Sequence, residues 1–318
     1  MTATRHWSED TGRGSRWLMR LMVRIGLSAP AAVSWLILHG ITTYFFIAAP
    51  AQRRASRAYL WRVLERRPGW LDQYRHIWTF ACSLFDRVQL LAGDPKVFDV
   101  RVVYRDEVAP SLLDQPCLLL GAHLGNFELL RWLAGYHPAL SVRPLMYREQ
   151  DQTIDDVLRD LNPGVFDHIL EIGPIDGLLA AREALEQGDS LALLADRCPP
   201  HTRGRTASLL GDSVQLPEGP FVLAEALNIP VVLCFGLRRG WRRYEVHLEA
   251  FDIEPRQGAG ADRDERVATA TQAFADRVGG YCRAAPYNWF NFYDYWNDLA
   301  VAGPDRSGDG VARGERRR

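Results

Sequence analysis

Cysteine is scarce in this chain of 318 residues. The five cysteines lie far apart in the sequence, and no two of them form a CxxC pair. An odd number of widely spaced cysteines argues against a disulfide framework and favours reduced thiols in a cytosolic setting. The spacing also offers no ligand set for a structural zinc ion, so we expect neither a metal nor another cofactor.

Formal charge is missing from the long stretch between Ile25 and Gln52. The 19 residues between Pro30 and Pro50 would span roughly 28 Å as a helix, which is close to the hydrocarbon thickness of a bilayer. The stretch is only moderately apolar, because it contains Ser34, His39 and Thr42. Arginines flank it on both sides, so the positive-inside rule gives no orientation. We expect a helix in contact with a membrane, spanning it or lying in its interface; a buried core helix is the alternative.

Lysine is almost absent, since Lys96 is the only one and arginine carries nearly all the positive charge. Residues 1–75 hold twelve arginines and four acidic residues, which leaves this part with about eight positive charges and the rest with about nine negative ones. A basic front end favours an anionic partner, either a membrane surface or nucleic acid, or forms a merely solvated face. The uncharged segment among the arginines favours the membrane surface, and we expect no nucleic acid partner.

Short apolar runs alternate with helical patterns from about residue 97. Earlier, Arg54–Glu65 and Trp70–Leu91 have apolar residues at helical spacings. Alternating strands and helices predict an α/β fold with a mostly parallel sheet flanked by helices. We expect a basic, membrane-associated helical region at 1–95, a catalytic α/β domain at 96–300 and a disordered tail at 301–318. The expected strands are Phe98–Tyr104, Cys117–Ala122, His168–Ile172, Ser190–Ala195, Pro230–Phe235 and Tyr244–Phe251. The expected helices are Asn126–Ala134, Thr153–Leu161, Ile175–Glu186, Pro217–Leu227 and Asp262–Cys282.

The stretch from His123 to Glu128 combines a histidine and an acid at a strand-to-helix junction. It follows an apolar run, which places His123 past the carboxyl end of a strand, where open α/β sheets bind ligands. Residues five apart do not meet on one helix, so the two side chains touch only if His123 lies in the loop before it. Gly125 permits the tight turn, and Asn126 is a suitable N-cap that puts Glu128 in the first turn.

In that geometry the carboxylate accepts a hydrogen bond from one imidazole nitrogen, and the other nitrogen accepts a proton from a substrate hydroxyl. We expect His123 to be the general base and Glu128 its orienting partner, with the carboxylate raising the histidine pKa toward 7. The motif has no serine or cysteine nucleophile, which favours direct attack of an acceptor hydroxyl on a thioester. The plainer interpretation is an ordinary loop histidine beside a surface glutamate.

The motif His-Leu-Gly-Asn-Phe-Glu resembles the HxxxxD/E motif of the lysophospholipid acyltransferase superfamily, and its form with Glu resembles the late acyltransferases of lipid A biosynthesis. The resemblance covers most of residues 15–300 and continues through Leu194-Ala195-Asp196-Arg197, Leu210-Gly211 and Leu216–Ala224. The ending Ala285–Trp296, together with Phe85–Val88, resembles the subgroup found with aryl-polyene and xanthomonadin-type pathways. Its aromatic residues would line an acyl groove, lie at headgroup level or cap the core.

This resemblance implies a glycerolipid-acyltransferase-like fold and an O-acyltransferase that uses an acyl carrier protein or acyl-CoA thioester and a lipid or glycolipid hydroxyl. It implies the roles of His123 and Glu128 given above. We expect the basic front end to hold the protein on the cytoplasmic face of the inner membrane, because thioester donors are made in the cytosol. One departure matters. The glycerolipid branch has a Pro-Glu-Gly-Thr-Arg block for the acceptor phosphate, whereas Pro217-Glu218-Gly219 is followed here by Pro220 and Phe221. A glycerol-phosphate acceptor is therefore disfavoured.

Further candidates for substrate contact are Asn126, Asp196, Arg197 and Arg203. The last three follow the strand expected at Ser190–Ala195, and they reach the edge that carries His123 if both strands run parallel. Arginines there suit a phosphate of the donor or acceptor, although a solvated loop with a structural Asp–Arg pair explains them equally well. Two other functions stay open: a lipid A or lysophospholipid acyltransferase, and a non-catalytic membrane-docked lipid-binding protein.

Overall fold

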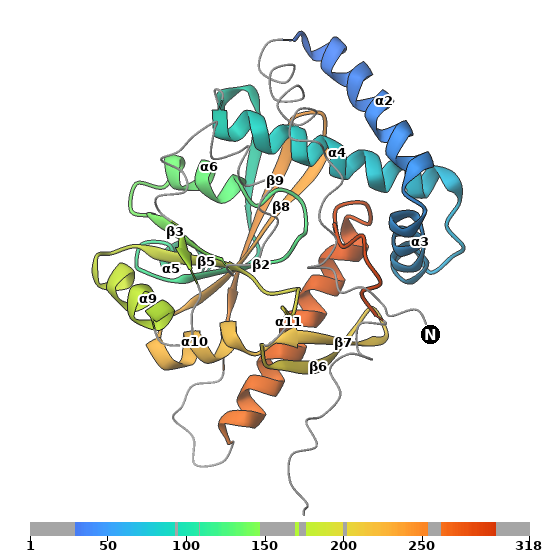
Figure 1. Ribbon diagram of the computed structural model, residues 1–318. Coiled ribbons are helices and arrows are strands. Elements are labelled where there is room, and N and C mark those ends of the chain that lie inside the picture. The colour runs from blue at the N-terminus through green and yellow to red at the C-terminus, as the bar shows by residue number, and fades with distance from the viewer. Residues whose placement is uncertain are drawn as a thin grey trace, which may run out of the picture.

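The computed structural model describes residues 29–92, 95–107, 109–146, 169–171, 176–199, 202–253 and 262–296 (Figure 1). The helix expected at Thr153–Leu161 and the tail from residue 301 lie outside these described residues. Within them, helices flank a mostly parallel sheet, which confirms the expected α/β class.

The sheet has seven strands in the order β1-β9-β8-β2-β5-β3-β4. The strands from β8 to β4 run parallel, whereas β9 pairs antiparallel with β8 and carries β1 beside it at the edge. Since β2 and β5 are parallel neighbours, the residues that follow them emerge at one edge. The strands are β1 (Asp99–Tyr104), β2 (Leu118–Gly121), β3 (Val142–Met146), β4 (Leu170–Glu171), β5 (Ser190–Leu194), β8 (Val231–Gly240) and β9 (Arg243–Phe251).

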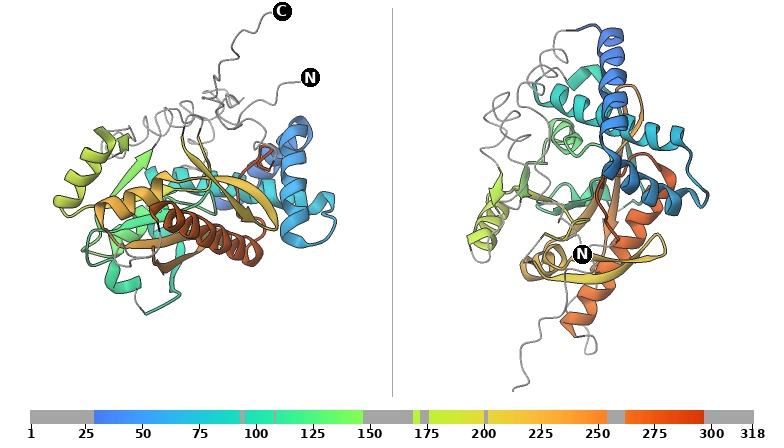
Figure 2. Two further views of the ribbon diagram at one scale, coloured as in Figure 1. Left: turned by 90° about the horizontal axis from the view of Figure 1, so that it is seen from below. Right: turned by 45° about the vertical axis from the view of Figure 1, so that its right-hand side comes forward.

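Helices cover both faces of the sheet (Figures 1 and 2). Because side chains alternate along a strand, Leu120 of β2 joins one buried cluster with Phe221 and Phe274, whereas Leu119 joins a second cluster with Leu129. The covering helices are α5 (Ala109–Leu112), α6 (Leu129–Tyr136), α9 (Asp176–Glu186), α10 (Gly219–Leu227) and α11 (Arg263–Ala284).

Among the described residues, three helices and a short 3-10 turn precede the sheet: α2 (Ala31–Ala48), α3 (Pro50–Leu64), α4 (Trp70–Ala92) and η2 (Pro95–Val97). Tyr59 and Leu60 of α3 are fully buried in the same cluster as β2. Helix α3, part of the N-terminal region 1–95, therefore packs with the α/β core.

Helix α2 remains on the outside of the molecule (Figure 1). It is long and apolar enough to cross a membrane, with a mean hydropathy of 1.6, and only 17% of it is buried. This exposure rules out the alternative of a buried core helix, whereas a membrane anchor or a signal sequence fits. Its exposed large side chains are Val33, Trp35, Leu36, Tyr44, Phe45 and Ile47.

Three strands were missed by the sequence analysis. Strand β3 contains Arg143 and Pro144, so it has no continuous apolar run. Strands β6 (Gly204–Leu209) and β7 (Asp212–Pro217) form an antiparallel hairpin in a region that we interpreted as a loop. Its two-residue turn, Leu210–Gly211, has positive φ at both positions, as a tight hairpin turn requires.

Candidate functional site

His123 and Asp196 lie at the same edge of the sheet, as the sequence analysis predicted. Gly121 at the end of β2 is in register with Leu194 at the end of β5, and each polar residue follows two positions later. The backbone N–H of His123 donates to Asp196 Oδ1 over 3.0 Å. Parallel pairing thus brings together two residues that are far apart in the chain.

The loop after β2 crosses directly over β8. Gly125 has a φ of +77°, and a Cβ built on it would lie 1.8 Å from the carbonyl oxygen of Gly236. The N–H of Asn126 donates to that carbonyl over 2.8 Å. Only glycine fits this close, left-handed crossing, so Gly125 determines where the His123 loop runs.

The aromatic C-terminal segment pairs with the same loop. Gly125 N–H donates to the Asn288 carbonyl over 2.7 Å, and Phe290 N–H donates to the His123 carbonyl over 2.8 Å. Between them, Leu124 and Trp289 form an antiparallel bridge. The backbone around Leu124, directly after His123, is therefore fixed by a segment that lies more than 160 positions later in the sequence.

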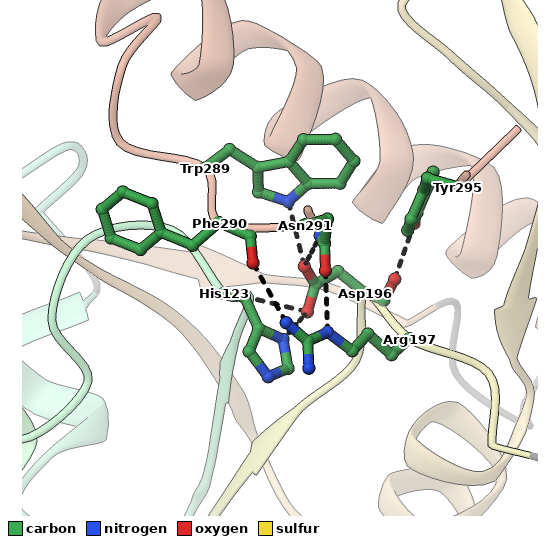
Figure 3. Close-up of polar contacts among 7 residues, drawn as sticks. All are labelled: His123, Asp196, Arg197, Trp289, Phe290, Asn291 and Tyr295. Atoms are coloured by element: carbon green, nitrogen blue, oxygen red, sulfur yellow. Dashed lines mark hydrogen bonds and ion pairs between the residues drawn. The ribbon is translucent and has the colours of Figure 1, made fainter. Parts of the chain in front are cut away.

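Four hydrogen bonds converge on the carboxylate of Asp196, which is fully buried (Figure 3). Oδ1 accepts from the backbone N–H of His123 and lies 2.8 Å from its Nδ1. Oδ2 accepts from Trp289 Nε1 and Asn291 Nδ2, each over 2.9 Å. Tyr295 donates to the Asp196 carbonyl over 2.6 Å, so side chain and backbone are both held.

Asp196 stays ionised in this setting. Burial alone would raise the pKa of its carboxyl, but the charge and hydrogen bond of His123, the Arg197 charge and the Asn291 amide together hold that pKa below its usual range. A carboxylate only accepts hydrogen bonds, so Nδ1 of His123 carries the proton. The opposite nitrogen, Nε2, then has a free lone pair, and the described residues give it no hydrogen bond.

His123 is a neutral imidazole at neutral pH. Burial and the Arg197 charge lower its pKa, and a weaker contribution from Arg87 adds to them, while Asp196 opposes the shift. The net direction is downward, so our expectation that a carboxylate would raise this pKa toward 7 is wrong. The side chain retains 18% exposure, which leaves Nε2 within reach of a substrate.

Glu128 is not the hydrogen-bond partner that the structure gives to His123. Its Oε1 instead accepts from Arg87 Nε of α4 over 3.0 Å, and its side chain is 7% exposed. Asn126 does not cap the helix either, because α6 begins at Leu129 and the Asn126 side chain accepts from the Glu128 N–H in the preceding turn. His123 does lie in the loop before the helix, as predicted, but the turn directs the two side chains to different partners, so the predicted hydrogen bond between them is not formed.

One face of α4 lies along the site. His76 Nε2 donates to the Trp289 carbonyl over 2.7 Å while its Nδ1 accepts from Ser56, and burial lowers its pKa to about 4, so it stays neutral. Phe80 contacts the rings of Phe290 and Phe292. Further along the same face, the Ser83 carbonyl accepts from Asn126 and Arg87 binds Glu128. The spacing of four, three and four residues keeps these positions on one side of the helix.

The remaining candidates differ in how they fit substrate contact. Asp196 is fully buried and Asn126 is 3% exposed, so both support the site from within and do not suit the substrate contact that we expected. Arg197 donates from Nε to Asn291 and from Nη2 to the Phe290 carbonyl, beside the His123 ring (Figure 3). Arg203 is 87% exposed and lies 3.8 Å from Glu218, at the entrance of the β6–β7 hairpin, where its substrate role stays a prediction.

Sequence analysis missed the supporting role of the C-terminal aromatics. Trp289 is fully buried against Tyr59 and Tyr295, so capping the core was the correct alternative for it. Its indole N–H at the same time reaches the site. Among the described ranges, no group of three or more His, Cys, Asp or Glu side chains is placed to hold a metal ion.

Comparison with known proteins adds no identity to this geometry. No family model matches the chain, and no curated protein matches it. The function has to be argued from the side chains around His123.

Proposed function

We propose that this protein is an O-acyltransferase that moves an acyl chain from an acyl carrier protein or CoA thioester to a hydroxyl of a lipid or glycolipid. The observation that carries the proposal is the His123–Asp196 pair. A buried carboxylate fixes the proton on Nδ1 and leaves Nε2 as a base at a partly exposed edge of the sheet.

In the proposed reaction, Nε2 of His123 takes the proton of the acceptor hydroxyl as its oxygen attacks the thioester carbonyl carbon. The carbonyl electrons move to oxygen and form a tetrahedral intermediate. When the intermediate collapses, the carbon–sulfur bond breaks, and the leaving thiolate takes the proton from the imidazolium. Asp196 stabilises that imidazolium, the role that the acid has in hydrolase triads.

The lipid nature of the acceptor is supported by α2 and by the sequence resemblance. The large exposed side chains of α2 suit insertion into a bilayer, and the basic residues around it suit anionic headgroups. We propose the inner membrane, on the cytoplasmic face where thioester donors are made. The resemblance to the lysophospholipid acyltransferase superfamily supports the same fold and chemistry, in aryl-polyene-type or related lipid biosynthesis, with lipid A or a lysolipid as the alternative acceptor.

The direct experiment measures thiol release from an acyl carrier protein thioester, with protein in lipid vesicles and the host's polar lipid extract as acceptor. The wild type should release thiol and give an acylated lipid by mass spectrometry. His123→Ala should lose about 10²- to 10⁴-fold in turnover, the usual contribution of a general base. His137→Ala is the matched control, since this partly exposed histidine follows α6 and contacts Asp114.

A folded His123→Ala protein that turns over like wild type would refute the mechanism. A wild type that binds lipid but never transfers an acyl chain would favour the membrane-docked binding protein.

The proposed location is tested by fractionation of the full-length protein and of a version without residues 1–52. Each arginine near anionic lipid adds about 1 kcal/mol, so the truncated protein should leave the membrane fraction. Equal distribution of both proteins would contradict a membrane role for this segment.

A further inference from the structure

Arg87 lies at the end of the α4 face that covers the site. The same face reaches Trp289 through His76 and Asn126 through the Ser83 carbonyl. Arg87 follows Ser83 by one helical turn, so its side chain points to the loop that carries His123. The helix therefore brings Arg87 to the site, and Glu128 then holds its guanidinium.

The guanidinium of Arg87 is held firmly but only at one edge. Its Nε donates to Glu128 Oε1 over 3.0 Å, and its central carbon lies 4.5 Å from the centroid of the Phe127 ring. The side chain is 16% exposed. Among the described residues no further hydrogen bond to this guanidinium is found, so both terminal nitrogens can donate to a ligand. A fixed, largely desolvated cation with free donors suits an oxygen anion.

The charge of Arg87 also acts on His123. It contributes to the lowered pKa of that imidazole, after burial and Arg197. Arg197 differs from Arg87, because its Nε and one terminal nitrogen donate to the acceptors Asn291 Oδ1 and the Phe290 carbonyl. Arg87 instead has both terminal nitrogens left for a reacting group.

We propose that Arg87 binds the carbonyl oxygen of the thioester and stabilises the negative charge that forms on it, and that Glu128 positions this guanidinium. The inference rests on the proposed acyl transfer. In this proposal Glu128 orients Arg87 and does not orient His123. As the acceptor oxygen attacks, the carbonyl electron pair moves to the oxygen that faces Arg87. It returns when the carbon–sulfur bond breaks, so Arg87 itself exchanges neither electrons nor protons.

The test compares Arg87→Met and Arg87→Lys with Arg143→Met in the thiol-release assay. Arg143 is a matched control, since it forms a similar, largely buried ion pair with Asp189. This pair lies at the amino-terminal ends of β3 and β5, whereas the site lies at the carboxyl ends of the parallel strands. Arg87→Met should lower kcat about 10²- to 10³-fold with little change in KM, as loss of one oxyanion donor does. The acidic limb of its pH profile, where the rate rises with pH as His123 is deprotonated, should move to higher pH, because a cation that lowers the pKa of His123 is gone.

Arg87→Lys should retain the position of the limb, because the positive charge remains, and still lose most of kcat, because the planar fork is lost. Glu128→Gln should lower kcat less than Arg87→Met does. If Arg87→Met does not fold, the Arg87→Lys and Glu128→Gln proteins carry the same comparison.

Four results would overturn the inference. A rise in KM alone would mean that Arg87 binds a ground-state anion such as a substrate phosphate. Equal losses in Arg87→Met and Arg143→Met, without a shift of the limb, would mean a structural ion pair. An active wild type that depends on His123 but not on Arg87 contradicts this inference alone, whereas a wild type without thioester turnover contradicts the proposed function as well.

Discussion

Two carboxylates lie near His123, and their surroundings differ. Asp196 comes from the end of β5 and is fully buried, and it receives donors from His123, Trp289 and Asn291. Glu128 lies five positions after His123, yet its side chain turns to Arg87 of α4. The hydrogen-bond partner of His123 is therefore not the acid nearest in sequence. It is the acid that follows β5, the parallel neighbour of β2.

The largest effect should come from a change at Gly125, where the loop between His123 and Glu128 crosses β8. Gly125→Ala would place a methyl group on the Gly236 carbonyl at a φ that disfavours side chains. Left-handed strain alone costs about 1–3 kcal/mol, and the overlap with backbone adds to it. We expect a loss of more than about 3 kcal/mol in the free energy of unfolding, measured by thermal or denaturant unfolding in detergent.

Gly135→Ala is the matched control, because no atom lies within 4 Å of a Cβ at that position in α6. This change should be neutral or stabilise the protein by roughly 0.5–1 kcal/mol. Similar stability of the two variants would show that the close approach of Gly125 to Gly236 is not needed for a stable fold. It would contradict the view that this crossing fixes the position of the His123 loop.

The next largest effect should separate the two carboxylates themselves. Asp196→Asn removes the charge that stabilises the imidazolium and releases the proton position on His123, so turnover should fall about 10³- to 10⁴-fold. Glu128→Gln leaves the His123–Asp196 hydrogen bond in place, and its loss should be about 10-fold. Thiol release by folded protein, checked by circular dichroism, measures both. The reverse order would restore Glu128 as the orienting acid.

Arg197→Lys should have the smallest effect. Lysine retains the positive charge but not the paired contacts with Asn291 and the Phe290 carbonyl, so Asp196 is held less well. We expect turnover to fall several-fold, up to about 10-fold, with the pH limb unchanged. Unchanged kinetics in this variant would show that the contacts of Arg197 with Asn291 and the Phe290 carbonyl are not needed for acyl transfer.

Much of this arrangement was predictable from the sequence, because local patterns determine it. The apolar run before His123, the glycine at position 125 and the strand before Asp196 gave the strand–turn–helix unit and the shared sheet edge. The partner of His123 was not predictable, since it depends on the register of β2 with β5 and on donors from Trp289 and Asn291. The β6–β7 hairpin was missed because its strands are mostly polar and contain no continuous apolar run.

The central claim is that His123 is a neutral base at physiological pH. Its most direct test is the pH dependence of single-turnover acyl transfer by the wild type and by His123→Ala. The general base must be unprotonated, so the rate should rise with pH through the histidine pKa. Burial and Arg197 lower that pKa, so the rise should be centred below the ordinary value of about 6.5. The limb should vanish in His123→Ala. A limb of the same position and height in a folded His123→Ala protein would contradict the account.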